Sequence, residues 1–168
     1  MEDRNSHEAI AARANQLDPI VMYLIVKESL SMSIGKTAAQ CAHASQMLTL
    51  KYFSQKFKDQ NSFGFCSKTD LVTNILVADI VSNILVADHL AMKSNDLFEE
   101  WLNNSFRKVV LRASDHQFER MKKEITNHIV VVDAGLTEIE SGSETVLGLW
   151  PMYRSTCPKY LTKLQVLK

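Results

Sequence analysis

Cysteine is scarce in this sequence, and its thiols have no arrangement that would build a covalent or metal-bound framework. The 168 residues include three cysteines, Cys41, Cys66 and Cys157. Because the number is odd and the spacing is unlike that of metal ligands, the sequence argues against both a disulfide scaffold and a zinc site. We therefore expect reduced thiols, no metal site and no cofactor.

Long apolar runs are also missing. No segment reaches the roughly 18–20 consecutive apolar residues that a membrane-spanning helix needs. The first residues include the charged Glu2, Asp3 and Arg4, and no apolar leader segment follows them. This composition argues against a secretory signal, and the acidic residues argue against a mitochondrial transit peptide. We expect a cytoplasmic protein with no membrane partner.

Neither sign of charge is in excess. The formal net charge is zero, so no field of the whole protein would attract nucleic acid. Residues 54–105 are mildly acidic, whereas residues 106–168 carry ten basic and seven acidic side chains. Binding of RNA would therefore need a local basic patch. An evenly solvated surface explains the charge distribution equally well.

The composition is typical of a single globular domain. Hydrophobic residues make up 46% of the chain and charged residues 23%, which argues against disorder. We divide the chain into an N-terminal helical extension, residues 1–18, and a domain, residues 19–168. An insertion at about residues 54–105 contains a nine-residue tandem repeat, residues 72–89. Two copies are fewer than the roughly three units that a solenoid needs, and a helical or hairpin form both stay open.

Four apolar segments predict β-strands. Residues 20–26 form a continuous apolar run of seven residues after a proline, which is typical of a buried strand. The other predicted strands are residues 106–112, 128–133 and 145–150. A helix that begins with a capping box of Ser114 and Gln117 connects the second strand to the third, and such a unit joins parallel strands. The predicted fold class is α/β, a four-stranded mixed β-sheet flanked by helices.

A long helix is predicted over about residues 35–53. Its helical periodicity places Lys36, Gln40 and His43 on one face. The opposite face, predicted to pack on the sheet, carries small and apolar residues: Ala38, Cys41, Ala42, Ser45, Leu48, Thr49 and Tyr52. Gly35 and Lys36 open the helix, where free backbone N–H groups and the positive end of the dipole favour an anion such as a phosphate group. The alternative is an ordinary solvated polar face.

Asp133 follows the third predicted strand directly. Its carboxylate would therefore lie at the carboxyl end of that strand, where ligands bind in α/β sheets. If the first strand runs parallel to the third, Asp133 and Thr137 would meet Lys36 and Gln40 at one edge of the sheet. The alternative is that Asp133 and Gly135 simply form a turn, which both residue types favour.

Two motifs connect these residues to a known family. Residues 32–44 have the sequence Met-Ser-Ile-Gly-Lys-Thr-Ala-Ala-Gln-Cys-Ala-His-Ala, and residues 133–139 have the sequence Asp-Ala-Gly-Leu-Thr-Glu-Ile. Together with the strand sequences around Met22 and Val109, they resemble the type II peptidyl-tRNA hydrolases. The resemblance implies a mixed four-stranded sheet with helices and a homodimer. It also implies an enzyme that hydrolyses the ester bond of peptidyl-tRNA and releases peptide and free tRNA.

The resemblance also implies roles for particular residues. Lys36, Asp133 and Thr137 would be catalytic. The substrate-binding residues would be Gly35, Gln40, His43 and Gly135. By hypothesis, Asp133 orients or deprotonates a water molecule, Thr137 holds that water or the substrate, and Lys36 stabilises the oxyanion or binds the terminal phosphate.

Three positions depart from the family sequences. Ser29-Leu30-Ser31 stands where Asp-Leu-Lys is usual, and Glu138 stands where glutamine is frequent. Thr162-Lys163-Leu164-Gln165 replaces a common Gly-His-Leu-Lys. Because Ser31 removes a positive charge and Glu138 adds a negative one, two further hypotheses stay open. The chain would then bind RNA or another phosphorylated ligand without turnover, or serve as a protein-interaction module.

Overall fold

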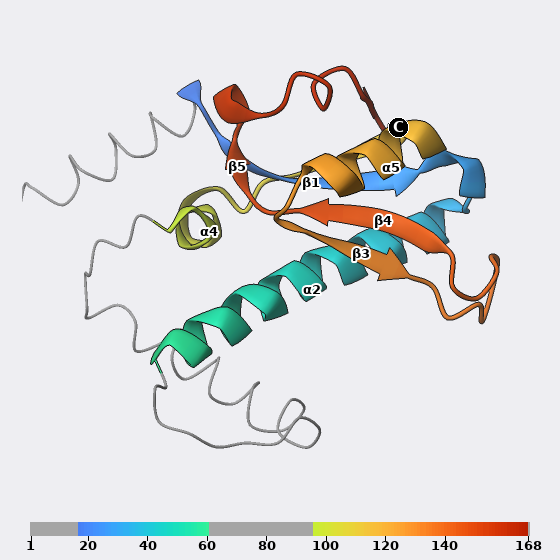
Figure 1. Ribbon diagram of the computed structural model, residues 1–168, viewed down its shortest axis with the longest axis horizontal. Helices are drawn as coiled ribbons and strands as arrows, with labels where there is room; N and C mark the ends of the chain where they lie inside the picture. The colour runs from blue at the N-terminus through green and yellow to red at the C-terminus, as the bar shows by residue number, and fades with distance from the viewer. Residues whose placement is uncertain (1–16, 61–95, 168) are drawn as a thin grey trace, which may run out of the picture. The chain divides into compact units, whose positions relative to one another are not determined.

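The computed structural model describes residues 17–60 and 96–167 (Figure 1). Residues 1–16 of the predicted N-terminal helical extension, the tandem repeat at residues 72–89 and Cys66 lie outside these described residues. The elements in chain order are β1 (Ile20–Lys27), η1 (Glu28–Leu30), α2 (Ile34–Gln60), α4 (Leu97–Glu100), η3 (Trp101–Ser105), β2 (Lys108–Ala113), α5 (Asp115–Glu124), β3 (His128–Val132), β4 (Glu144–Leu149), β5 (Met152–Tyr153), η4 (Arg154–Thr156) and β6 (Gln165–Val166).

The strands form one mixed sheet in the order β3-β4-β1-β2-β6, and β5 pairs with β1 outside this path. β1 is parallel to β2, whereas β4 is antiparallel to both β1 and β3. β1, β2 and β3 therefore run in the same direction. The α/β prediction and its four strands are confirmed, and the sheet has two further strands, β5 and β6. Each of these has two residues, which is too short to leave a sequence pattern.

α5 connects β2 to β3 as predicted. Its capping box is present, because the Ser114 side chain accepts the N–H of Gln117 while the Gln117 side chain accepts the N–H of Ser114. β2 and β3 run in the same direction but are not neighbours, since β1 and β4 lie between them.

Both faces of β1 are buried, because successive side chains of a strand point to opposite faces of the sheet. One face packs in a cluster with side chains of α2, and the other with side chains of α5. The two helices accordingly lie on opposite sides of the sheet (Figure 1). Burial on both faces explains why the β1 sequence is a continuous apolar run instead of an alternating one.

The buried face of α2 differs from the predicted one. The α2 residues that pack toward the sheet are Thr37, Gln40, Cys41, Ala44, Leu48 and Tyr52. Ala38 and Ala42, predicted to be buried, are exposed. The buried stripe is rotated by roughly 80° about the helix axis toward Gln40, at about 100° per residue. Small residues occur all around this helix, so their spacing does not locate the packed face.

Residues 96–105 contribute to the same core as β1. Asp96 caps α4 by accepting the N–H groups of Phe98 and Glu99. Phe98 stacks on Tyr52 of α2 with ring centroids 4.4 Å apart, and both Phe98 and Trp101 are fully buried. In the described part of the chain, no helix is both long enough and apolar enough to cross a membrane.

Candidate active site

Two loops meet at the edge of the sheet where β1 and β3 end. β1 leads through η1 to the first turn of α2, which carries Lys36, and β3 leads directly to Asp133. Because the two strands run in the same direction, both loops leave the sheet at the same edge. Lys36 Nζ lies 2.6 Å from Asp133 Oδ1, and the two side chains are 12% and 6% exposed. The predicted convergence of the ammonium and the carboxylate is present.

Asp133 accepts three hydrogen bonds. Its Oδ1 atom accepts from Lys36 Nζ and, at 2.8 Å, from Gln40 Nε2. Its Oδ2 atom accepts the backbone N–H of Gly135 at 2.9 Å. The Lys36 hydrogen bond, followed by the Gly135 N–H, lowers the pKa of the Asp133 carboxyl. All three donors favour the charged form, so Asp133 is a fixed carboxylate at neutral pH.

Gln40 links Asp133 to the sheet. While its Nε2 group donates to Asp133, its Oε1 atom accepts the hydroxyl of Thr145 at 2.8 Å. Thr145 lies on β4 and is completely buried. Because the Asp133 carboxylate can only accept, it fixes the Gln40 amide with Nε2 toward it. The Thr145 hydroxyl, which also lies 3.2 Å from the Val131 carbonyl, donates to the other end of the amide. Thr145 is not among the predicted site residues, although a polar residue at the start of an apolar strand is a signal that could have identified it.

Thr137 lies beside Lys36 on the loop that follows β3. Its Oγ1 atom accepts from Lys36 Nζ at 2.9 Å, and the residue is exposed. Because this hydroxyl accepts from the ammonium, its own proton remains available for a bond to a water molecule or a substrate. Within the described residues, Asp133 and Thr137 use two of the three N–H groups of Lys36.

Glu138 contacts the start of α2 directly. Its carboxylate accepts the backbone N–H of Ser33 at 2.9 Å and the Ser33 hydroxyl at 2.5 Å. The Ser33 oxygen in turn accepts the N–H of Lys36 at 3.2 Å, as an N-cap residue does. The two Ser33 bonds, with the charge of Lys36, lower the pKa of Glu138. A carboxylate can accept both Ser33 donors at once, one on each oxygen, which an amide cannot do.

The two glycines of the site differ in their structural requirement. Gly135 has φ +76°, and a Cβ atom there would lie 2.5 Å from the backbone nitrogen of Ser141. Gly135 is therefore required by the turn that directs its N–H at Asp133. Gly35 has open space at the corresponding position. The turn predicted as one of two alternatives for Asp133 and Gly135 is present, and it lies where the Asp133 carboxylate contacts Lys36.

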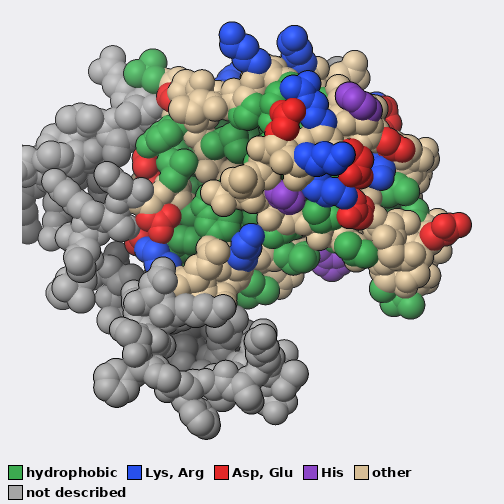
Figure 2. Space-filling model, viewed as in Figure 1, with side chains coloured by type: hydrophobic (Ala, Val, Ile, Leu, Met, Phe, Trp, Pro, Cys, Tyr) green, Lys and Arg blue, Asp and Glu red, His purple; other side chains and the backbone are tan. Residues whose placement is uncertain are grey.

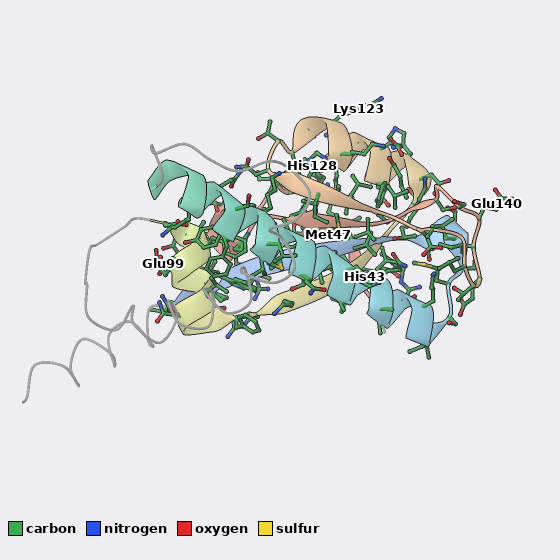
Figure 3. All side chains as sticks on the ribbon, turned by 90° about the horizontal axis from the view of Figure 1, so that it is seen from below. His43, Met47, Glu99, Lys123, His128 and Glu140 are labelled. Carbon is green, nitrogen blue, oxygen red and sulfur yellow. The ribbon has the colours of Figure 1, made fainter. Side chains whose placement is uncertain are left out.

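His43 does not join this cluster. It lies on the exposed side of α2, away from the sheet, as does Met47 (Figure 3). The prediction that His43 shares a face with Gln40 is wrong, because Gln40 is buried against the sheet. Lys36, Gln40, Asp133, Gly135 and Thr137 are brought together.

Neither a metal ion nor a thiol nucleophile is indicated by the described residues. They contain no group of three or more His, Cys, Asp or Glu side chains that could hold a metal ion. Burial raises the pKa of Cys41 to about 11, so its thiol stays protonated at neutral pH and is a poor nucleophile.

Comparison with known sequences decides the family. The family model for peptidyl-tRNA hydrolase PTH2 matches residues 20–167. This chain belongs to that family. The match includes both segments that form the cluster around Asp133, and the resemblance to type II peptidyl-tRNA hydrolases is confirmed.

Individual PTH2 relatives are similar at modest identity. The peptidyl-tRNA hydrolase of Methanopyrus kandleri is 29% identical over 133 residues, which is 76% of this chain and 81% of the relative. That of Thermoplasma acidophilum is 27% identical over 153 residues, or 87% and 97% of the two chains. Peptidyl-tRNA hydrolase 2 of Saccharomyces cerevisiae is 30% identical over 135 residues, which cover 77% of this PTH2 chain and 50% of the yeast protein.

Proposed function

We propose that this chain is an ester hydrolase that cleaves peptidyl-tRNA into peptide and free tRNA. Membership of the PTH2 family indicates the substrate. The observation that supports the chemistry is the ammonium of Lys36 held between Asp133 and the Thr137 hydroxyl at the edge of the sheet.

Asp133 acts by orientation more than by proton transfer. A general base works best when its pKa is near the working pH, whereas three donors hold the pKa of Asp133 below its ordinary value. The carboxylate therefore keeps Lys36 and the attacking water in place, and the Thr137 hydroxyl provides a second contact to that water or to the ester.

Lys36 stabilises the negative charge that forms on the carbonyl oxygen of the ester. Its two hydrogen bonds to Asp133 and Thr137 fix the ammonium and leave its third N–H for the substrate. A positioned donor of this kind is typically worth about 3–4 kcal/mol in the transition state. Since the ammonium is held in place before substrate arrives, little reorganisation is needed when the oxyanion forms.

Binding of tRNA would depend on local contacts to phosphate groups. The net charge is zero, and on the face shown in Figure 2 the Lys and Arg side chains are interspersed with Asp and Glu. The affinity should still decrease steeply with salt, because phosphate contacts release counterions. From the family resemblance we also propose that the protein is cytoplasmic and forms a homodimer. Sedimentation of the purified chain would test the homodimer.

The experiment is a turnover assay. The purified chain is incubated with peptidyl-tRNA, and the release of peptide is compared with that of Asp133→Asn, which keeps the size of the side chain and removes its charge. We expect hydrolysis by the unmodified chain and a strong loss in the variant. Salt-dependent binding of tRNA without release of peptide would instead identify a non-catalytic RNA-binding relative.

A further inference from the structure

Phe106 is held in a backbone conformation that is rare for a bulky residue. It has φ +46°, in the left-handed region where an aromatic side chain is an outlier. Its N–H donates to the carbonyl of Trp101 at 2.7 Å, and the following N–H, of Arg107, donates to Ser105 Oγ. The side chain is nevertheless 59% exposed. Local strain of this kind is often associated with function.

The ring of Phe106 rests on a rigid base. It stacks on Trp101 with centroids 4.9 Å apart and planes inclined by 23°. Trp101 is fully buried, and its Nε1 group donates to the carbonyl of Arg107 at 2.9 Å. The position of the exposed ring is thus determined by the core beneath it.

Lys108 adds a charge on the inner side of this ring. Its Nζ atom lies 3.5 Å from the centroid of Phe106 and 4.8 Å from that of Trp101, and it donates to the Phe106 carbonyl at 3.3 Å. If the ammonium and Trp101 lay on opposite faces of Phe106, the distance between them would be close to the sum of their two distances from the Phe106 centroid. The observed distance from Nζ to the Trp101 centroid is only 4.8 Å. Because they are much closer, they share one face, which leaves the opposite face of the ring for the exposed part of Phe106.

An exposed aromatic face with adjacent cations is suited to a nucleotide. Bases of single-stranded nucleic acid stack on aromatic side chains, and neighbouring basic residues bind the phosphates. Arg107 is exposed and Lys108 partly so, and burial lowers the pKa of Lys108, so a phosphate would stabilise its charged form. We propose that Phe106 is a stacking site for an unpaired base of RNA, whose phosphate Lys108 and Arg107 contact. This inference rests on the proposed function for the identity of the RNA as tRNA.

The stacking site is distinct from the candidate active site. Lys108 pairs with Met22 near the start of β1, whereas Lys36 and Asp133 lie beyond its other end. The five or so residues between these ends span roughly 17–20 Å in a β-strand. The base on Phe106 therefore belongs to a different nucleotide from the one that carries the ester, and it contributes to binding without touching the reacting atoms.

The experiment measures binding and turnover separately. Phe106→Gly removes the ring and suits the left-handed backbone, and Phe106→Tyr is the control that keeps an aromatic face. The probes are a short unstructured oligoribonucleotide and deacylated tRNA, with affinity measured by fluorescence anisotropy. We expect Phe106→Gly to weaken binding of both about tenfold, in the range for one stacked base, and Phe106→Tyr to bind as the unmodified chain does.

Steady-state hydrolysis supplies the second readout. Phe106→Gly should raise KM for peptidyl-tRNA about tenfold and leave kcat unchanged, because the ring lies away from the reacting atoms. Unchanged RNA affinity in Phe106→Gly would overturn the stacking site, and so would an equal loss of affinity in Phe106→Tyr. If Phe106→Gly changed only the sedimentation of the chain, Phe106 would belong to a protein interface and the stacking site would again be overturned. If the unmodified chain lacks turnover, the proposed function fails, while the oligoribonucleotide still tests the stacking site.

Discussion

Lys36 and Asp133 form a largely buried ion pair, 2.6 Å between Nζ and Oδ1, although 97 positions separate them in the sequence. The contact exists because β1 and β3 point in the same direction. Asp133 directly follows β3, and η1 and the start of α2 bring Lys36 to the same edge of the sheet. The surrounding hydroxyls and amides orient both charges, which gives the site a fixed polarity before any substrate binds.

Replacement of the ammonium tests the proposed chemistry. We expect Lys36→Ala to lower kcat for peptidyl-tRNA by roughly 10²–10³-fold, as the loss of one oxyanion donor does. Lys123→Ala is the control, since Lys123 is exposed on α5 (Figure 3) and should leave kcat unchanged. If Lys36→Ala retains full activity while circular dichroism shows a native fold, the assignment of Lys36 is wrong.

The hydroxyl of Thr145 should matter for stability through Gln40. Thr145→Val leaves the buried Gln40 Oε1 atom without that donor, and an unsatisfied buried acceptor costs about 1–3 kcal/mol. The free energy of unfolding in urea should fall by that amount, whereas Thr126→Val, at an exposed position, should change it little. In Gln40→Leu the same Thr145→Val change should cost less, because the acceptor is already gone. Equal costs in both backgrounds would contradict the proposed linkage.

Gly135 and Gly142 provide a matched pair for backbone strain. Both have positive φ, but only Gly135 has a close neighbour where a Cβ atom would lie, because Gly142 has nothing within 4 Å. We expect Gly142→Ala to cost about 1–2 kcal/mol from the left-handed conformation alone. Gly135→Ala should cost more and also reduce hydrolysis, since it displaces the N–H that Asp133 accepts. Thermal melting and turnover measured on both variants would check this; similar behaviour of the two would argue against the steric explanation.

The pH dependence of stability follows from the two carboxylates of the site. The pKa of Asp133 and that of Glu138 are lowered in the folded chain, so folding favours their ionised forms. Their contribution is fully present above the unfolded-state pKa of about 4 and is lost as the pH falls through the lower folded-state values. Urea unfolding between pH 7 and pH 3 should show a smaller acid-induced loss in Glu138→Gln than in the unmodified chain. The opposite order would mean that the carboxylate does not stabilise the start of α2.

Several features of the site were accessible from the sequence. Local hydrophobic patterns predict that Asp133 directly follows an apolar strand. They also predict that Lys36 lies in the first turn of a helix. Only the direction of β3 relative to β1 was needed to bring them together. The two motifs that contain these residues also identified the family. Such signals are local, because a strand, a helix start or a turn is encoded within a few consecutive residues.

The rotation of α2 was decided by tertiary structure. Gln40 is buried because it bonds Asp133, directly after β3, and Thr145 on β4. The resulting rotation of the helix leaves His43 exposed. Helical periodicity cannot identify the face that packs on the sheet when alanines occur on all sides of the helix. The bonds between Glu138 and Ser33 likewise join residues 105 positions apart, so neither residue by itself indicates the contact.

The sequence by itself determined the strands, the family and the chain positions of the ammonium and the carboxylate, since short-range hydrophobic order and a contiguous motif encode them. Only the tertiary structure decided which side of α2 faces the sheet, that Gln40 bonds both Asp133 and Thr145, and that Phe106 is stacked on Trp101. Each of these depends on packing or hydrogen bonding that becomes specific only when the elements are placed together.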